Sequence, residues 1–134
     1  MSIIHRVEAL NLPPEEFVVI GSGILDALRL RESGDVDLVI SPDLFAMLQN
    51  DDSWNVGEKR GEPIVTKGDT EAFLSWGSVG RVPNFRELYD AGVAIEGIRF
   101  ANPHFVMRWK QGRGMQKDLR DIALLEEYLK THPL

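Results

Sequence analysis

Two short apolar runs joined by a glycine-rich turn constrain this chain more than any other feature. Residues 19–40 read VIGSGILDALRLRESGDVDLVI, so one apolar run ends at Gly-Ser-Gly and a second begins within Asp-Val-Asp. Runs this short, rich in valine and isoleucine and bounded by glycine, favour buried strands. Between them, Ile24, Leu25 and Leu28 recur at the spacing of one helix face. The stretch therefore predicts a strand, a turn, a short helix and a second strand beside the first.

The rest of the chain continues this alternation of strands and helices. The apolar and turn patterns predict strands over residues 17–20, 36–40, 54–59, 63–67 and 70–76, and one or two more within 93–101. They predict helices over residues 2–11 and 22–31, from Ser41-Pro42, over 85–89, from Asn102-Pro103 and over 115–130. The last helix is expected to bury one stripe of side chains: Leu119, Ile122, Leu125 and Leu129. We expect an α/β (α+β) fold with a small mixed β-sheet flanked by helices.

Length and composition narrow the class of protein. The chain has 134 residues, which suits a single domain over 1–134, and 43% hydrophobic with 27% charged residues is typical of a globular protein. There is no cysteine, which excludes disulfides, thiolate nucleophiles and cysteine-ligated zinc. The apolar runs are far shorter than the roughly 20 residues that span a bilayer, and the start lacks a signal-peptide core. We therefore expect a cytoplasmic protein with no membrane partner.

The net charge of −6 makes the chain a poor general binder of nucleic-acid backbone. The basic residues are nevertheless concentrated in the last third: Arg99, Arg108, Lys110, Arg113, Lys117 and Arg120. Such a group can form a local site for an anion or a solvated helix surface.

The Gly-Ser-Gly turn does not match the common nucleotide-binding loops. A dinucleotide fingerprint needs a third glycine where this chain has Asp26, and a P-loop needs a Lys-Ser/Thr pair that is missing. The turn still places Ser22 at the start of a predicted helix, where free N–H groups and the helix dipole favour an anion.

Asp35 and Asp37 are two apart on a predicted strand, so both side chains project to one face. Two adjacent carboxylates suit a hard divalent cation, which also relieves their mutual repulsion. The plainer alternative is that Asp35 caps the turn after Gly34 and Asp37 faces water. The preceding turn favours the first reading, because phosphate and Mg²⁺ together are what phosphoryl or nucleotidyl transfer requires.

This arrangement resembles the nucleotidyltransferase-fold superfamily, which includes DNA polymerase beta. The family pattern is an apolar strand, Gly-Ser or Gly-Gly, about a dozen residues and then Asp-x-Asp in a second apolar strand. Here residues 18–22 are followed by residues 23–34 and then by Asp35-Val36-Asp37. The chain departs from many members at Gly34, where they have serine or threonine.

The C-terminal third is similar to the tail of small bacterial members of this superfamily. These include lincosamide-type antibiotic nucleotidyltransferases and nucleotidyltransferase-like toxins of type IV toxin–antitoxin systems. The matching residues are Lys110, Arg113, Lys117, Asp118 and Asp121. The resemblance implies a minimal form of the nucleotidyltransferase fold.

The resemblance implies transfer of a nucleoside monophosphate from an NTP to an acceptor hydroxyl, with Mg²⁺ (or Mn²⁺) as cofactor. Asp35 and Asp37 would hold the metal, and Glu71 would be the third carboxylate, with Asp69 and Glu96 as its rivals. The implied nucleotide- and phosphate-binding residues are Gly21, Ser22, Arg31, Lys110, Arg113 and Lys117. Trp76 is a candidate for stacking on the base.

Several of these residues have structural alternatives. Arg31 can be solvated, Lys117 can pair with Asp121 one helical turn away, and Arg113 can brace the tail acids. The acceptor stays open among a protein, a tRNA and a small molecule. A domain this small has little room for an acceptor site, so a partner chain or a homodimer is expected to complete it. The alternative function is a catalytically inactive regulatory, antitoxin or protein-interaction module that keeps the fold.

Overall fold

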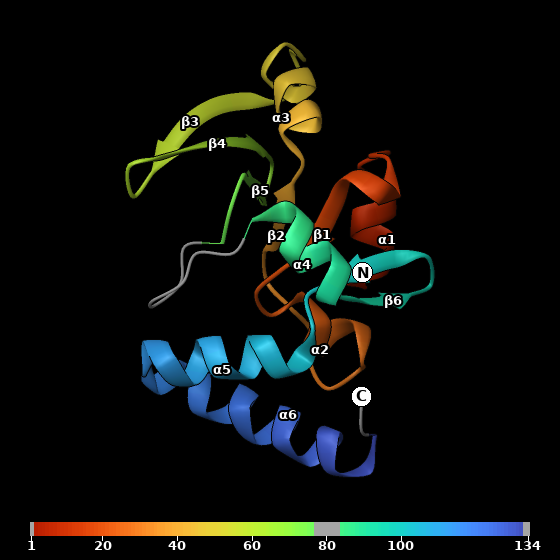
Figure 1. Cartoon of the computed structure of the whole chain (residues 1–134), viewed down its shortest axis with the longest axis vertical. Helices are drawn as coiled ribbons and strands as arrows, with labels where there is room; N and C mark the ends of the chain where they lie inside the picture. The colour runs from red at the N-terminus through yellow and green to blue at the C-terminus, as the bar shows by residue number, and fades with distance from the viewer. Residues whose placement is uncertain (1, 77–83, 133–134) are drawn as a thin grey trace.

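Seven strands form one mixed sheet in the computed structural model, which describes residues 2–76 and 84–132 (Figure 1). The strands are β1 (Phe17–Val19), β2 (Val36–Ile40), β3 (Asn55–Lys59), β4 (Glu62–Lys67), β5 (Thr70–Phe73), β6 (Val93–Ile95) and β7 (Ile98–Phe100). Their order across the sheet is β3-β4-β5-β2-β1-β7-β6. β2 runs antiparallel to β1 and parallel to β5, so the strand that carries Asp37 lies in the middle of the sheet.

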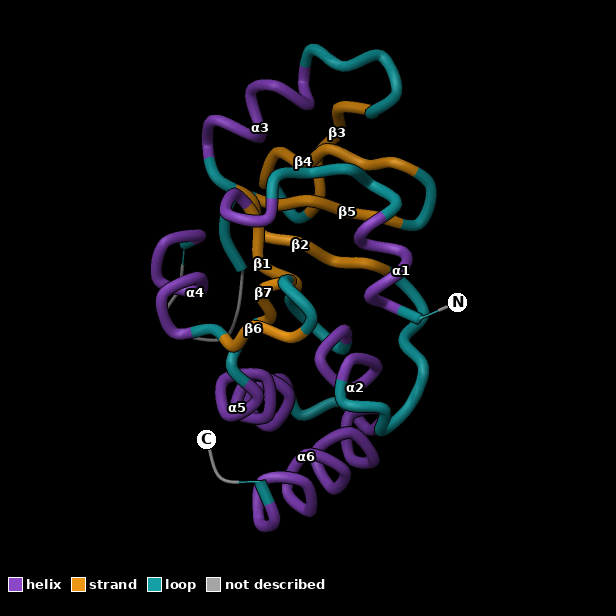
Figure 2. The backbone as a smooth tube through the Cα atoms, turned by 90° about the vertical axis from the view of Figure 1, so that its right-hand side faces the viewer, coloured by secondary structure: helices purple, strands orange, loops and turns teal. Residues whose placement is uncertain are grey.

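Helices flank the sheet, which confirms the predicted fold class. They are α1 (Ile3–Glu8), α2 (Gly23–Ala27), α3 (Pro42–Gln49), α4 (Phe85–Ala91), α5 (Pro103–Arg113) and α6 (Leu119–Thr131), with 3₁₀ turns η1 (Pro14–Glu16) and η2 (Gln116–Asp118). Seen along the sheet, α1 and α4 lie on opposite sides of the strands, and α5 and α6 lie below the β6–β7 end (Figure 2). None of the helices in the described part of the chain is long and apolar enough to cross a membrane.

The strands of the predicted strand–turn–helix–strand unit form the centre of the core. Val18, Leu38 and Val39 are fully buried, as expected for strands with neighbours on both edges and helices on both faces. Ser41 caps α3 as predicted, because its hydroxyl accepts a hydrogen bond from the Leu44 N–H at 3.1 Å and Pro42 occupies the first helical position.

The two glycines of the Gly-Ser-Gly turn are required for different structural reasons. Gly21 has φ +66°, a left-handed conformation that favours glycine. Gly23 begins α2 directly above β1, and a Cβ atom there would lie 2.5 Å from Cγ1 of Val19. The missing side chain at Gly23 therefore lets the helix pack on the strand that precedes it.

Gly23→Ala is expected to lower the free energy of unfolding by about 1–3 kcal/mol, because α2 or Val19 must shift to admit the methyl group. The matched control is Gly34→Ala, where a Cβ meets no atom within 4 Å, so its effect should stay within about 0.5 kcal/mol. Urea denaturation of both variants measures the difference. Equal stabilities for the two variants would contradict the packing argument.

The helix predicted over residues 22–31 is shorter than expected, because it ends at Ala27. Arg29 takes the left-handed conformation (φ 62°), and the Leu30 N–H donates to the Leu25 carbonyl at 2.8 Å. These features form a Schellman motif with arginine at the position that glycine usually occupies. The sequence lacks the glycine that would have marked this end.

The buried stripe predicted for the last helix was wrong at Leu119, which is 59% exposed. Leu125 is buried as predicted, and α6 and the preceding turn also bury Asp118 and Asp121. An apolar stripe is normally the inward face of a helix. Here two acids replace part of it because cations from other elements meet them.

Candidate active site

The predicted metal carboxylates lie on neighbouring parallel strands. The register pairs Asp37 of β2 with Glu71 of β5, so the two side chains project side by side from one face of the sheet. Asp35 precedes β2 by one residue and lines the same pocket as Asp37 and Glu71. Three carboxylates, one from β2, one from β5 and one from the residue before β2, therefore line one pocket.

These acids lie in a pocket of about 480 Å³ that also contains cations and aromatic rings. Its acidic residues are Asp35, Asp37, Glu62 and Glu71. Its basic residues are Lys59, Arg60, Arg113 and Lys117, and its larger rings are Phe73, Trp76 and Trp109. The volume is in the range of sites for small molecules and cofactors. The mixture of charges suits a ligand that brings both a metal cation and an anionic group.

Burial raises the pKa of Asp37 to about 6, and the negative charges of Glu71 and Asp35 raise it further, against a lowering effect of Lys59. Desolvation and like charge both disfavour the ionised carboxylate. A cation bound between these acids would remove much of that penalty.

Glu71 already has a cation as its partner. The Lys59 ammonium lies 2.9 Å and 3.0 Å from the two carboxylate oxygens of Glu71. Lys59 reaches Glu71 from the β3–β4 hairpin. The sequence predicted both strands of this hairpin but not that its turn faces the three carboxylates. No local sequence pattern marks Lys59 and Arg60 as pocket residues, because the register of three successive strands brings them there.

The rival third carboxylates lie elsewhere. Asp69 is 61% exposed and pairs with Arg6 of α1 at 2.5 Å, and Glu96 lies in the β6–β7 turn with φ 49°. Neither is among the residues that line the pocket, whereas Glu71 is.

Two side chains, Arg6 and Asp26, hold the loop that leads into Asp35. The Arg6 guanidinium donates to the carbonyls of Ser33 (3.1 Å) and Gly34 (2.5 Å), and the Asp26 carboxylate accepts from the Ser33 N–H at 3.0 Å. Asp26 also accepts from the Ile3 N–H at 3.2 Å, so the residue that breaks the dinucleotide fingerprint ties α1, α2 and this loop together. The position of Asp35 is therefore set before β2 begins.

Gly21 and Ser22 are placed differently with respect to the pocket. Gly21 lines it, and a Cβ atom on Gly21 would lie 3.4 Å from Oδ2 of Asp37, so the turn and the acid are adjacent. The Ser22 hydroxyl instead accepts a hydrogen bond from the Lys110 ammonium at 3.0 Å, and Ser22 is not among the lining residues.

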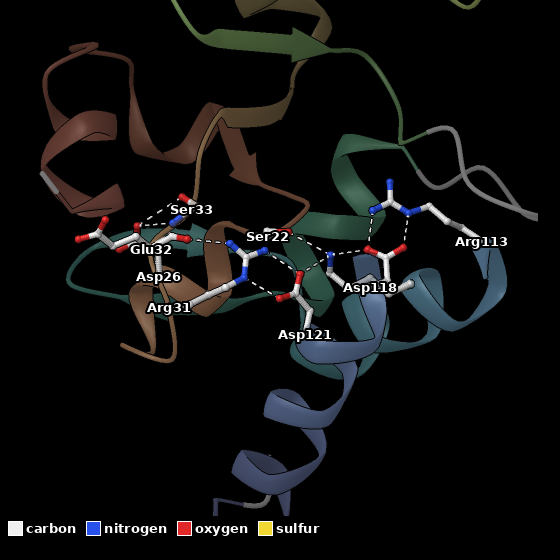
Figure 3. Close-up of polar contacts among 9 residues, drawn as sticks. Ser22, Asp26, Arg31, Glu32, Ser33, Arg113, Asp118 and Asp121 are labelled. Atoms are coloured by element: carbon white, nitrogen blue, oxygen red, sulfur yellow. Dashed lines mark hydrogen bonds and ion pairs between the residues drawn. The ribbon is translucent and has the colours of Figure 1, made fainter. Parts of the chain in front are cut away.

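A row of alternating charges connects Ser22 and Arg31 to the pocket (Figure 3). Arg31 binds Asp121 through two hydrogen bonds of 2.6 Å, and Arg113 binds Asp118 through two of 2.7 Å and 2.6 Å. Lys110 lies between the two acids, 3.1 Å from Oδ1 of Asp118 and 3.0 Å from Oδ2 of Asp121. We call these five residues the charge row.

The charge row keeps its acids ionised although they are buried. Hydrogen bonds from Arg113 and Lys110 outweigh desolvation and lower the pKa of Asp118 to about 2. Burial opposes the charge of Asp121, but hydrogen bonds from Arg31 and Lys110 bring its pKa below the usual value.

The structure separates the predicted phosphate-binding cations into two groups. Arg113 and Lys117 line the pocket, and the guanidinium of Arg113 also lies 4.1 Å from the ring centre of Trp109. Arg31 and Lys110 do not line it, and their charges are used within the charge row. The alternative role of Lys117, a pair with Asp121, is not found among the ion pairs of the described residues, where Arg31 and Lys110 bind the Asp121 carboxylate.

Trp76 belongs to an aromatic group at the side of the pocket. It is 5% exposed, and its ring centre lies 4.8 Å from that of Trp109 and 5.2 Å from that of Phe105. Packing in the core accounts for most of its surface, so the proposed stacking on a base stays a prediction.

No protein-family model, curated protein or solved structure matches the chain. What the site can do chemically follows from its own residues.

The donor set fits a hard divalent cation. Within residues 2–76 and 84–132, no three or more His, Cys, Asp or Glu side chains are already arranged as a metal site. However, the donors in the pocket are carboxylate oxygens, which Mg²⁺ and Mn²⁺ prefer, and one of them already holds a cation. Asp35, Asp37 and Glu71 are the residues that would hold the metal after Glu71 exchanges its partner.

Proposed function

We propose that the protein is a Mg²⁺- or Mn²⁺-dependent nucleotidyltransferase of the nucleotidyltransferase fold. It would move a nucleoside monophosphate from an NTP to a hydroxyl of a protein, a tRNA or a small molecule. The observation that carries the proposal is the strand register that places Asp37 beside Glu71. Both line a pocket that also contains Asp35, Gly21 and four basic side chains. The proposal includes a cytoplasmic location, where NTPs are made.

Each residue of the pocket has a role in the proposed reaction. Asp35, Asp37 and Glu71 would hold the metal, which would supply charge neutralisation at the phosphates and a more acidic acceptor hydroxyl. Lys117 offers N–H donors to phosphate oxygens, as does the part of the Arg113 guanidinium that does not bind Asp118, and Gly21 lets the backbone approach the phosphate closely. The acceptor oxygen bonds to the α-phosphorus, the bond to the bridging oxygen breaks and pyrophosphate leaves. The acceptor proton passes to Glu71 or to water.

A specific observation supports a second candidate function. The Glu71 carboxylate is paired with Lys59 and the Ser22 hydroxyl with Lys110. Three of the expected phosphate-binding cations, Arg31, Lys110 and Arg113, are bound to Asp118 or Asp121. An inactive descendant that acts as a regulatory, antitoxin or protein-interaction module would need none of these groups free.

Label transfer separates the two candidates. We expect radiolabel from α-labelled NTPs, supplied one at a time with Mg²⁺ or Mn²⁺, to reach an acceptor in lysate, in total tRNA or in the protein itself. Glu71→Gln should lose this activity by at least about 100-fold, because one deleted group of a charge-stabilising site typically costs that much. Asp69→Asn, two residues earlier on the same segment and outside the pocket, should keep it.

Two results would contradict the proposed nucleotidyltransferase activity. One is the absence of NTP binding by calorimetry with either metal. The other is transfer that survives Glu71→Gln unchanged, since that would place the chemistry elsewhere. Either result would favour the non-enzymatic module.

A further inference from the structure

Lys59 is held at the edge of the pocket by a tight hairpin. It is the last residue of β3 and pairs in register with Glu62, so only Arg60 and Gly61 form the turn. Both turn residues have positive φ, 54° and 80°, the combination of a type I′ hairpin. The backbone of Lys59 is therefore fixed, while its long side chain can still move.

The contact with Glu71 covers the atoms that a metal would use. The Lys59 ammonium lies within 3.0 Å of both carboxylate oxygens, so the carboxylate cannot bind a metal fully while this pair stays formed. Arg60 lines the same pocket from the adjacent turn position, which brings two cations from one hairpin to the acids.

The two lysines near the site differ in how easily they can be released. The Lys110 side chain is 1% exposed and has Ser22, Asp118 and Asp121 as partners. The Lys59 side chain is 43% exposed and its partner Glu71 25% exposed. Ion pairs in such an exposed setting are held weakly and exchange readily. Lys110 is thus a permanent part of the fold, whereas Lys59 can change partner.

We propose that Lys59 occupies Glu71 only while the metal is absent, and that its ammonium group moves to the triphosphate when the metal nucleotide binds. This inference rests on the proposed function. The exchange conserves charge pairing at each step, because Glu71 passes from the ammonium to the metal while Lys59 passes from a carboxylate to a phosphate oxygen. Lys59 is then a phosphate-binding residue that also makes metal binding depend on nucleotide.

Lys59→Met should change two affinities in opposite directions. Removing the competing ammonium should tighten binding of Mn²⁺ alone by about three- to fivefold, and removing the phosphate contact should weaken binding of preformed Mn²⁺–tripolyphosphate by a similar factor. Tripolyphosphate carries no base, so the unknown base preference does not matter. Calorimetric titration measures both. Lys67→Met is the matched control, since it removes the same charge from an exposed position outside the pocket.

The outcomes distinguish this inference from the proposed function. Wild-type affinities of Lys59→Met for both probes, or a change of the same sign for both, would overturn the exchange even if label transfer is observed. A crossed change without label transfer would retain the exchange and reject the enzyme. A wild-type protein that binds neither Mn²⁺ nor Mn²⁺–tripolyphosphate would overturn both. A purely structural Lys59 would alter thermal stability and leave the two affinities unchanged.

Discussion

Lys110→Met is expected to lower the free energy of unfolding by about 3–5 kcal/mol, because it leaves two buried carboxylates without their shared cation. Asp118 and Asp121 keep one arginine each, but the lysine position between them becomes apolar and the Ser22 hydroxyl loses its donor. Urea denaturation followed by circular dichroism measures the loss. α2, α5 and α6 are all attached at this point, so the effect should be global.

The controls for Lys110→Met isolate the buried charge. Lys130→Met, an exposed lysine on α6, should stay within about 0.5 kcal/mol of the wild type. Asp118→Asn should cost less in the Lys110→Met background than alone, since the residues share one network. A Lys110→Met protein within about 1 kcal/mol of the wild type would mean that the charge row contributes little to stability.

The strands were predictable because their signals are local. Residues 17–20 and 36–40 are rich in valine and isoleucine and bounded by turn residues, and β1 and β2 form there. The last helix was harder to read. Its apolar spacing placed Leu119 inside, but the partners that allow Asp118 and Asp121 to be buried come from α5 and from the turn after α2. Hydrophobic periodicity holds no information about such distant cations.

The same distinction applies to the candidate site. The alternation of a strand predicted that Asp35 and Asp37 share a face, and Glu71 was chosen because the resemblance implies a third carboxylate on a later strand. The register between β2 and β5 decides that Glu71, and not Asp69, lies beside Asp37. The position of Lys59 next to Glu71 depends on the registers of β3 with β4 and of β4 with β5. A shift of one residue would reverse the face of each side chain.

Asp37→Asn is expected to stabilise the protein and to abolish the proposed nucleotidyl transfer. The ordinary pKa of 3.8 rises to about 6 in the folded state, so the folded protein retains a proton that the unfolded chain has released. Stability therefore falls as pH rises from about 4 to about 6, and the full penalty, at most about 3 kcal/mol, persists above that range. Asparagine avoids it, so the variant should be more stable by about 1–3 kcal/mol at pH 7.5 and nearly equal to the wild type at pH 3.5.

The direction of this change separates a binding site from ordinary structure. Removing a charged group that stabilises the fold lowers the free energy of unfolding, as is expected for Lys110→Met. Removing a carboxylate that serves only to bind a cation raises the free energy of unfolding, because in the absence of the cation that carboxylate destabilises the fold. Thermal unfolding at both pH values, with and without Mg²⁺, measures this, with exposed Asp52→Asn as the control. Mg²⁺ should stabilise the wild type more than Asp37→Asn, since the variant lacks a ligand. A less stable Asp37→Asn at pH 7.5 would show that the Asp37 carboxylate belongs to the fold, and the case for a metal site at β2 and β5 would fail with it.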